Sequence, residues 1–333
     1  MAQHGIRHSG HIKGRAVFTA LFLLMPLINA EAAPKAYITN QKDNTVSVID
    51  TTSGAVIQTV PVGSQPAGVA VSADGARVVV SNPASRDITI IDGHDDRVLG
   101  AVAVGNSPVG IALDNSGRTA YVADWYDARV AVVDVEQMTV SGWIPVGKSP
   151  AGIAISPNGQ SVYVANRDDD TIALVDPLTQ SVQKTVTVGK HPFGITLDAG
   201  AHRLYVANVE SNDVSVVDTE RFQVIANIPV GDRPYAIAVT REGQDIWVTN
   251  QYDNTVSVID TASQKIIATV PVGEYPEGIA VHPDGHNVYV ANWFSNSVTV
   301  LDTEQHRAVA TIATGNGSRA FGAFLPGRSA LSP

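Results

Sequence analysis

Residues 36–40 read AYITN, and six related pentapeptides follow at a constant interval of 42 residues. They are VVVSN, AYVAD, VYVAN, LYVAN, IWVTN and VYVAN, starting at residues 78, 120, 162, 204, 246 and 288. A repeat of about 40 residues that contains several short β runs is typical of one propeller blade, a four-stranded sheet. Seven repeats therefore predict an all-β, seven-bladed propeller built of antiparallel four-stranded blades.

The first repeat divides into four apolar runs with turn residues between them. The chain starts with what would be the second strand of a blade, and it ends with a run typical of a first strand, residues 319–325. A ring closed by pairing leaves no sheet edge open. We therefore predict that the C-terminal strand pairs with residues 36–62 and closes the ring.

The first 32 residues differ in class from the repeats. Three basic residues precede an apolar run at residues 16–27, and Ala30-Glu31-Ala32 forms an A-x-A cleavage pattern. The apolar run is shorter than the roughly 20 residues that a membrane-spanning helix needs. We interpret residues 1–32 as a secretory signal peptide and residues 33–333 as the propeller. The mature protein should be periplasmic or secreted and have no membrane span.

Composition limits the partners. The chain has no cysteine, which excludes disulfides, thiolate metal sites and C-x-x-C-H haem attachment. Its formal net charge of −10 lacks the basic footprint that nucleic-acid binding needs, so a nucleic-acid partner is not expected. We expect a monomer, no cofactor and no metal site, because the acidic run Asp168-Asp169-Asp170 lacks the spacing of a calcium loop.

The motifs YVAN or YVTN, NTVSVIDT, TVPVG and P-x-GIAV resemble the YVTN-type β-propeller repeat family from residue 36 to about 327. The resemblance implies a seven-bladed propeller. The wider family includes surface-layer and antigen-like proteins, periplasmic proteins, and relatives of phosphogluconolactonase and of haem-containing propellers. It implies no particular catalytic residue here.

Polar residues that recur in every repeat are interpreted as framework. An aspartate ends each TVSVID-type strand, where its carboxylate can bond the backbone of the following turn. These aspartates are Asp50, Asp92, Asp134, Asp176, Asp218, Asp260 and Asp302. An asparagine likewise ends the YVAN-type strand in six of the repeats, and Asp124 takes its place in the third.

One slot varies strongly while the framework does not. It follows the proline that precedes the innermost strand, at the predicted mouth of the channel. Around the ring it holds Ala67, Val109, Ala151, Phe193, Tyr235, Glu277 and Arg319. Small residues in three consecutive blades and large ones in four predict a lopsided mouth with a pocket. Loops on a fixed scaffold are common carriers of binding residues.

We therefore predict a ligand site on the loop face around the central channel. Its residues are Phe193, Arg233, Tyr235, Tyr252, Tyr275, Glu277, Trp293 and Arg319. His191 and Glu277 are the candidate catalytic bases. Glu277 and Arg319, in neighbouring blades, are either an ion pair that seals the ring or a clamp for ligand.

Two function classes fit this sequence. One is an exported module that binds a small molecule, a cell-envelope component or a protein through the loop face. The alternative is a lactonase-like hydrolase or lyase that holds a small anionic substrate with Arg319, Arg233 or Lys190. His191 or Glu277 would act as its base. We favour the module, since no reactive motif such as G-x-S-x-G is present.

If residues 1–32 are an export signal, mass spectrometry of the protein from its native host should find a mature N-terminus at Glu31 or Ala33. An intact Met1 or Ala2 terminus in a cytoplasmic fraction would exclude export.

Overall fold

In a computed structural model of the chain, the described residues are 1, 2, 4, 5, 10, 34–240 and 243–327. The chain divides into two units between residues 32 and 33. The signal peptide expected at residues 1–32 falls almost wholly outside the described residues and stays a prediction. No helix in the described part of the chain is long and apolar enough to cross a membrane.

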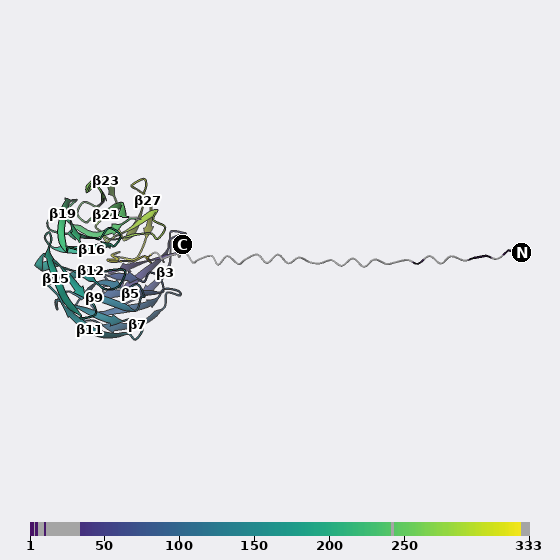
Figure 1. The fold of residues 1–333 in the computed structure, drawn as a ribbon, viewed down its shortest axis with the longest axis horizontal. Coiled ribbons are helices and arrows are strands. Elements are labelled where there is room, and N and C mark those ends of the chain that lie inside the picture. The colour runs from purple at the N-terminus through teal and green to yellow at the C-terminus, as the bar shows by residue number, and fades with distance from the viewer. Residues whose placement is uncertain (3, 6–9, 11–33, 241–242, 328–333) are drawn as a thin grey trace. The chain divides into compact units, whose positions relative to one another are not determined.

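Seven antiparallel sheets surround a central channel, and each sheet is one blade (Figure 1). Blade 1 contains β1 (Lys35–Asn40), β2 (Thr45–Asp50) and β3 (Ala55–Pro61). Blade 2 contains β4 (Val69–Val71), β5 (Arg77–Asn82), β6 (Asp87–Asp92) and β7 (Val98–Ala103). Blade 3 contains β8 (Pro108–Leu113), β9 (Thr119–Asp124), β10 (Arg129–Asp134) and β11 (Thr139–Pro145). Blade 4 contains β12 (Pro150–Ile155), β13 (Val162–Asn166), the 3-10 turn η1 (Arg167–Asp169), β14 (Thr171–Asp176) and β15 (Ser181–Thr187).

Blades 5 to 7 repeat this order. Blade 5 contains β16 (Pro192–Asp198), β17 (Arg203–Asn208), β18 (Asp213–Asp218) and β19 (Gln223–Pro229). Blade 6 contains β20 (Pro234–Val239), β21 (Asp245–Asn250), β22 (Thr255–Asp260) and β23 (Lys265–Pro271). Blade 7 contains β24 (Pro276–Val281), β25 (Asn287–Asn292), β26 (Ser297–Asp302) and β27 (Arg307–Ala313). The predicted all-β, seven-bladed fold is confirmed.

Burial follows position within a blade. The second and third strands, such as β21 and β22, are buried over nearly their whole length, because neighbouring blades cover both of their faces. The last strands, such as β15 and β27, lie at the perimeter and are largely exposed (Figure 1). The core consists of apolar clusters between adjacent blades; one joins Tyr205 and Val216 of blade 5 to Ile246 and Val248 of blade 6. This is why the strands lack a simple apolar–polar alternation.

The recurring polar residues hold the backbone, as predicted. Asn250 Nδ2 donates to Thr255 Oγ1 at 3.0 Å and to Ser257 Oγ at 2.9 Å. Gly231 passes so close to this side chain that a Cβ there would lie 2.6 Å from Asn250 Cγ. The connector between blades therefore needs glycine at this position, because any larger residue would collide with the asparagine. Each aspartate that ends a TVSVID-type strand accepts a hydrogen bond from a backbone N–H in the following turn. Asp260 accepts from Ser263 N at 2.7 Å.

The C-terminal segment, residues 318–325, closes the ring against blade 1. Arg319 N donates to Thr39 O, and Tyr37 N donates to Phe324 O, both at 2.9 Å. An antiparallel bridge also joins Ser318 to Asn40. The segment thus occupies the innermost position of blade 1, and the predicted closure is confirmed.

The closing segment differs from the expected regular strand. Phe321 forms a parallel bridge with Gly68, and its carbonyl accepts a hydrogen bond from Val69 N of β4 at 2.9 Å. Gly322 has a φ of +119°, and a Cβ there would lie 2.5 Å from Val69 O. Because one short segment bonds both β1 and β4, its backbone must turn at Gly322, which only glycine allows readily.

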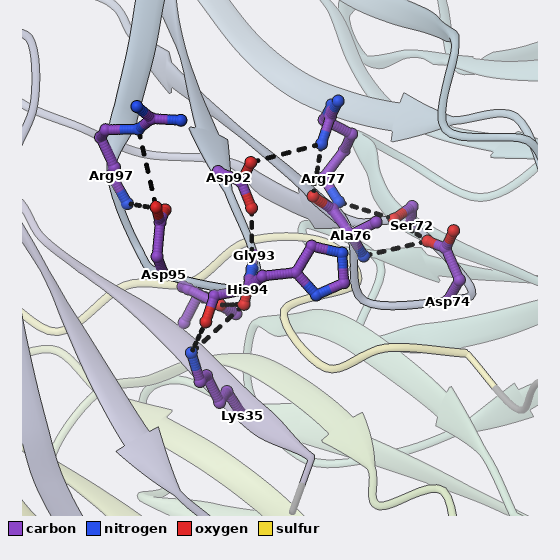
Figure 2. A network of polar contacts seen from close by, with 11 residues as sticks. Lys35, Ser72, Asp74, Ala76, Arg77, Asp92, Gly93, His94, Asp95 and Arg97 are labelled. Carbon is purple, nitrogen blue, oxygen red and sulfur yellow. Dashed lines mark hydrogen bonds and ion pairs between the residues drawn. The ribbon is translucent and has the colours of Figure 1, made fainter. Parts of the chain in front are cut away.

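A polar network fastens the far end of β1 to blade 2 (Figure 2). Lys35 Nζ lies 2.8 Å from Asp96 Oδ2 and 3.2 Å from the carbonyls of Gly93 and His94. Tyr37 Oη donates to Asp96 Oδ1 at 2.7 Å, and burial beside this carboxylate raises the pKa of Tyr37. These residues come from the start of the ring and the β6–β7 loop, so the network stabilises the junction between blades 1 and 2.

Deleting residues 318–333 should destabilise the propeller severely. Phe321 and Phe324 are buried, and each buried phenylalanine contributes about 3–5 kcal/mol. We expect the free energy of unfolding to fall by roughly 6 kcal/mol or more, measured by denaturant titration. Deleting only residues 328–333 is the matched control and should change it by less than about 0.5 kcal/mol. Equal stability of both truncations would contradict closure by this segment.

Candidate functional site

The mouth of the channel is filled by aromatic side chains. Phe193 of β16 and Tyr235 of β20 are 6% and 5% exposed, and their ring centroids lie 4.3 Å apart. Phe321 packs 4.8 Å from Phe193, and Trp125 packs 6.0 Å from it. We call Trp125, Phe193, Tyr235 and Phe321 the channel plug.

This arrangement differs from the open, lopsided mouth expected. The small residues on the other side of the ring do not leave a pocket, since Ala151 and Val109 belong to the same apolar cluster as the plug. The room that they provide is taken by Phe193 and Phe321. Small and large residues in the varying slot are therefore complementary in packing.

A buried polar network borders the plug. Arg319 Nε donates to Glu277 Oε2 at 2.6 Å, and Arg319 Nη2 donates to Tyr235 Oη at 2.8 Å. Glu277 Oε1 accepts from Gln251 Nε2 at 3.1 Å. Glu277 is 4% exposed, whereas the Arg319 side chain keeps 22% of its surface. The pair joins blade 7 to the closing segment, as the ring-sealing alternative predicts.

Burial opposes the ion pair in setting the pKa values of this network. It raises the pKa of the Glu277 carboxyl, and the Arg319 guanidinium and the Gln251 amide partly offset that rise. The Glu277 charge raises the pKa of Arg319, against the effect of burial. Burial likewise raises the pKa of Tyr235, which stays protonated and accepts from Arg319.

Four aromatic residues, two exposed and two half-buried, lie beside this network on the loops of blades 6 and 7. Tyr275 lies at the centre, with ring centroids 5.9 Å from Tyr252, 5.7 Å from Trp293 and 5.1 Å from Phe294. Trp293 and Phe294 are 4.4 Å apart. Tyr252 is 55% exposed and Phe294 50%. We call these four residues the aromatic arc.

A cation covers each end of the aromatic arc. The Arg233 guanidinium lies 5.1 Å from the Tyr252 ring, and Lys42 Nζ lies 4.8 Å from the Trp293 ring. Such cation–π contacts hold long side chains against the rings. The arc and its two cations therefore form a continuous surface of aromatic rings and positive charges over the loops of blades 6 and 7, with Lys42 reaching it from blade 1.

Three predicted site residues share a strained backbone position before a proline. His191, Arg233 and Tyr275 have φ values of 54°, 57° and 57°. An L-residue in this region costs on the order of 1–3 kcal/mol. The backbone N–H of each is held by a side-chain oxygen of the preceding blade, such as Asn254 Oδ1 for Tyr275 at 2.9 Å. Gly317 fills the same slot before the closing segment, which shows that a smaller residue fits there.

The predicted residues come together in two groups. Phe193, Tyr235, Glu277 and Arg319 form the plug and its polar network, while Arg233, Tyr252, Tyr275 and Trp293 form the cation-covered arc. The groups adjoin along the chain, since only Pro276 separates Tyr275 from Glu277. His191 belongs to neither group; its Nδ1 lies 3.3 Å from Glu210 Oε2.

Five residues of the described site are not among the eight that were predicted: Lys42, Trp125, Gln251, Phe294 and Phe321. Phe321 stands where the innermost strands carry Val or Ile, and an aromatic in that slot is its sequence signal. Gln251 fills the slot that holds Trp125 and Trp293 in other blades, which all point toward the mouth. Within the described ranges, no group of three acidic or histidine side chains could hold a metal ion.

The sequence placed Glu277 and Arg319 at the open mouth of the channel, where alanine substitutions would leave the fold intact. Because the structure buries this pair, we expect its loss to lower the stability of the propeller. Glu277→Ala leaves the Arg319 charge without its partner, so we expect a loss of about 3 kcal/mol in unfolding free energy. The double variant Glu277→Leu/Arg319→Met should recover most of it. Glu274→Ala, at an exposed carboxylate nearby, is the control and should stay within about 0.5 kcal/mol. Wild-type stability of Glu277→Ala would show that the pair contributes nothing.

Comparison with solved structures shows the same fold at low identity. Hydrazine synthase of Kuenenia stuttgartiensis aligns with a TM-score of 0.70 and 23% identity, over 76% of this chain and 87% of that chain. A functionally unknown protein from Desulfotomaculum acetoxidans gives 0.74 and 16%, over 86% and 100%. Dihydro-heme d1 dehydrogenase NirN in complex with DHE gives 0.67 and 13%, over 88% and 76%.

Sequence comparison identifies the family. No curated protein matches the chain significantly. A family described as "Lactonase, 7-bladed beta-propeller" matches residues 137–224. A family described as "YNCE-like beta-propeller" matches residues 30–118 and 187–282, more than half of the chain. With its seven closed blades, this chain belongs to the YNCE-like β-propeller family.

Proposed function

We propose that this protein is an exported binding module whose ligand rests on the aromatic arc. The observation that carries the proposal is the continuity of the arc: Tyr275 contacts the other three rings, and Arg233 and Lys42 lie over the rings at its two ends. Trp, Tyr and Arg are the residues that most often dominate binding energy at interfaces. The ligand is a small molecule, a cell-envelope component or a protein.

The place of Tyr275 in the aromatic arc supports this proposal. Its backbone adopts a conformation that glycine would adopt at lower cost, and the same slot contains glycine at Gly317. The strained backbone carries the Tyr275 ring to the centre of the arc, where it contacts three other rings. Gln65, Ser149, His191 and Arg233 share this backbone conformation, so the strain belongs to the framework. The three ring contacts of Tyr275 are what support a role for its side chain.

The closed mouth also favours binding over catalysis. An enzyme of the lactonase type needs a deep polar pocket in which titratable groups converge on the substrate. Here the plug fills the mouth, and the Glu277 carboxylate is occupied by Arg319 and Gln251. The aromatic arc lies on the surface beside it, which suits a ligand that docks from outside.

Export rests on the sequence of the leader. The A-x-A pattern after a short apolar run favours removal of residues 1–32 and a periplasmic or secreted protein. The resemblance to YVTN-type repeats agrees with a cell-envelope role.

A lactonase-like hydrolase or lyase remains the second candidate, because the lactonase family matches residues 137–224. That range contains His191, whose Nδ1 faces Glu210. An enzyme of this kind would turn over sugar lactones and lose turnover on His191→Ala. The binding module would show no turnover with either protein.

A thermal-shift screen should reveal the ligand, because binding to the folded state raises the melting temperature. The screen covers sugar lactones, peptidoglycan fragments, cell-wall peptides, metals and oligonucleotides. For a hit, Phe294→Ala and Tyr275→Gly should each weaken affinity at least about tenfold by calorimetry. Tyr126→Ala removes an exposed tyrosine from a loop of blade 3 and is the matched control. Equal loss in all three variants, or none in the first two, would place the site away from the aromatic arc.

A further inference from the structure

The far half of the channel holds a cavity of about 470 Å³, separate from the aromatic arc. It is lined by the ends of the innermost strands, among them Ile153, Leu197 and Val239. Phe321 forms its inner end and separates it from the mouth. The exposed lining residues Asn115 and Gly327 mark the outer end, where the cavity reaches solvent.

The lining is uncharged. Among the described residues that border the cavity, none has an ionisable side chain, and the polar side chains are those of Asn115 and Thr196. Thr196 Oγ1 already donates to Ile237 O at 2.5 Å. An ion that entered would lose its hydration without gaining an opposite charge, which is strongly unfavourable. The lining therefore disfavours a charged ligand relative to a neutral one.

The wall is not purely apolar. The innermost strands of blades 3 to 6 are edges of their sheets, and their backbones bond a neighbouring strand on one side only, as β12 and β16 do. The free edges carry peptide N–H and C=O groups that remain available for hydrogen bonds. A ligand with an apolar body and one or two hydrogen-bonding atoms would satisfy both parts of this wall.

From this geometry we propose that the far half of the channel binds a small, neutral, predominantly apolar molecule. The volume lies within the range of about 300–1,000 Å³ typical of small-molecule pockets. The closing segment supplies part of the wall through Ala323 and Leu325. The site is therefore complete only in the closed ring.

The test compares two dyes that share one aromatic frame. N-phenyl-1-naphthylamine is neutral, and 1-anilinonaphthalene-8-sulfonate differs from it by a sulfonate. Fluorescence titration of the purified protein should show one saturable site for the neutral dye and at least about tenfold weaker binding of the anion. Equal binding of the two dyes, or no saturable binding of the neutral one, would overturn the proposal without any variant.

Variants then locate the site. Ala323→Phe reduces the volume, and Leu197→Glu introduces a charge into the lining. Each should weaken binding of the neutral dye at least about tenfold. Ile267→Glu places the same charge at an exposed aliphatic residue of β23, and Phe294→Ala alters the aromatic arc. Both controls should bind within about twofold of wild type. Undiminished binding by both cavity variants, or loss on Phe294→Ala, would place the dye elsewhere.

Discussion

The structure depends on one short segment that bonds two blades. Residues 318–325 provide the innermost element of blade 1 and also bridge to β4 of blade 2. Without this segment, β1 and β4 would both have free inner edges, and the ring would be held across that gap by side chains such as Lys35 and Asp96. The turn at Gly322 makes the double pairing possible.

Closure and site are built from the same residues. Arg319 bonds Glu277 and Tyr235 at the mouth, and two residues later Phe321 divides the channel. The closing segment therefore separates a filled half of the channel from an open one. This arrangement leaves two different surfaces for ligands, an aromatic and cationic one outside and an uncharged one within.

The repeated residues explain how the varied ones are tolerated. The recurring asparagines and aspartates form the same local hydrogen bonds in successive blades, and the recurring glycines pack against the asparagines. A side-chain hydrogen bond also holds the residue before the proline in its strained conformation. Because the backbone is determined by residues elsewhere in the repeat, the displayed side chain is free to change from Ser149 to Tyr275. A rigid framework with varied slots is how a scaffold carries a site.

The sequence by itself determined the all-β class, the seven blades, their limits and the pairing of the two ends, because an unbroken 42-residue period permits one architecture. It also identified Phe193, Tyr235, Glu277 and Arg319 as exceptional, since they break the repeat. Only the tertiary structure decided that these residues fill the mouth, and that Phe321, from the closing segment, packs among them. Packing of this kind depends on side chains brought together from blades far apart in the chain. The 42-residue repeat determines where each varying position lies in the fold. The volumes of the side chains that meet across the channel decide whether those positions form a pocket or a plug.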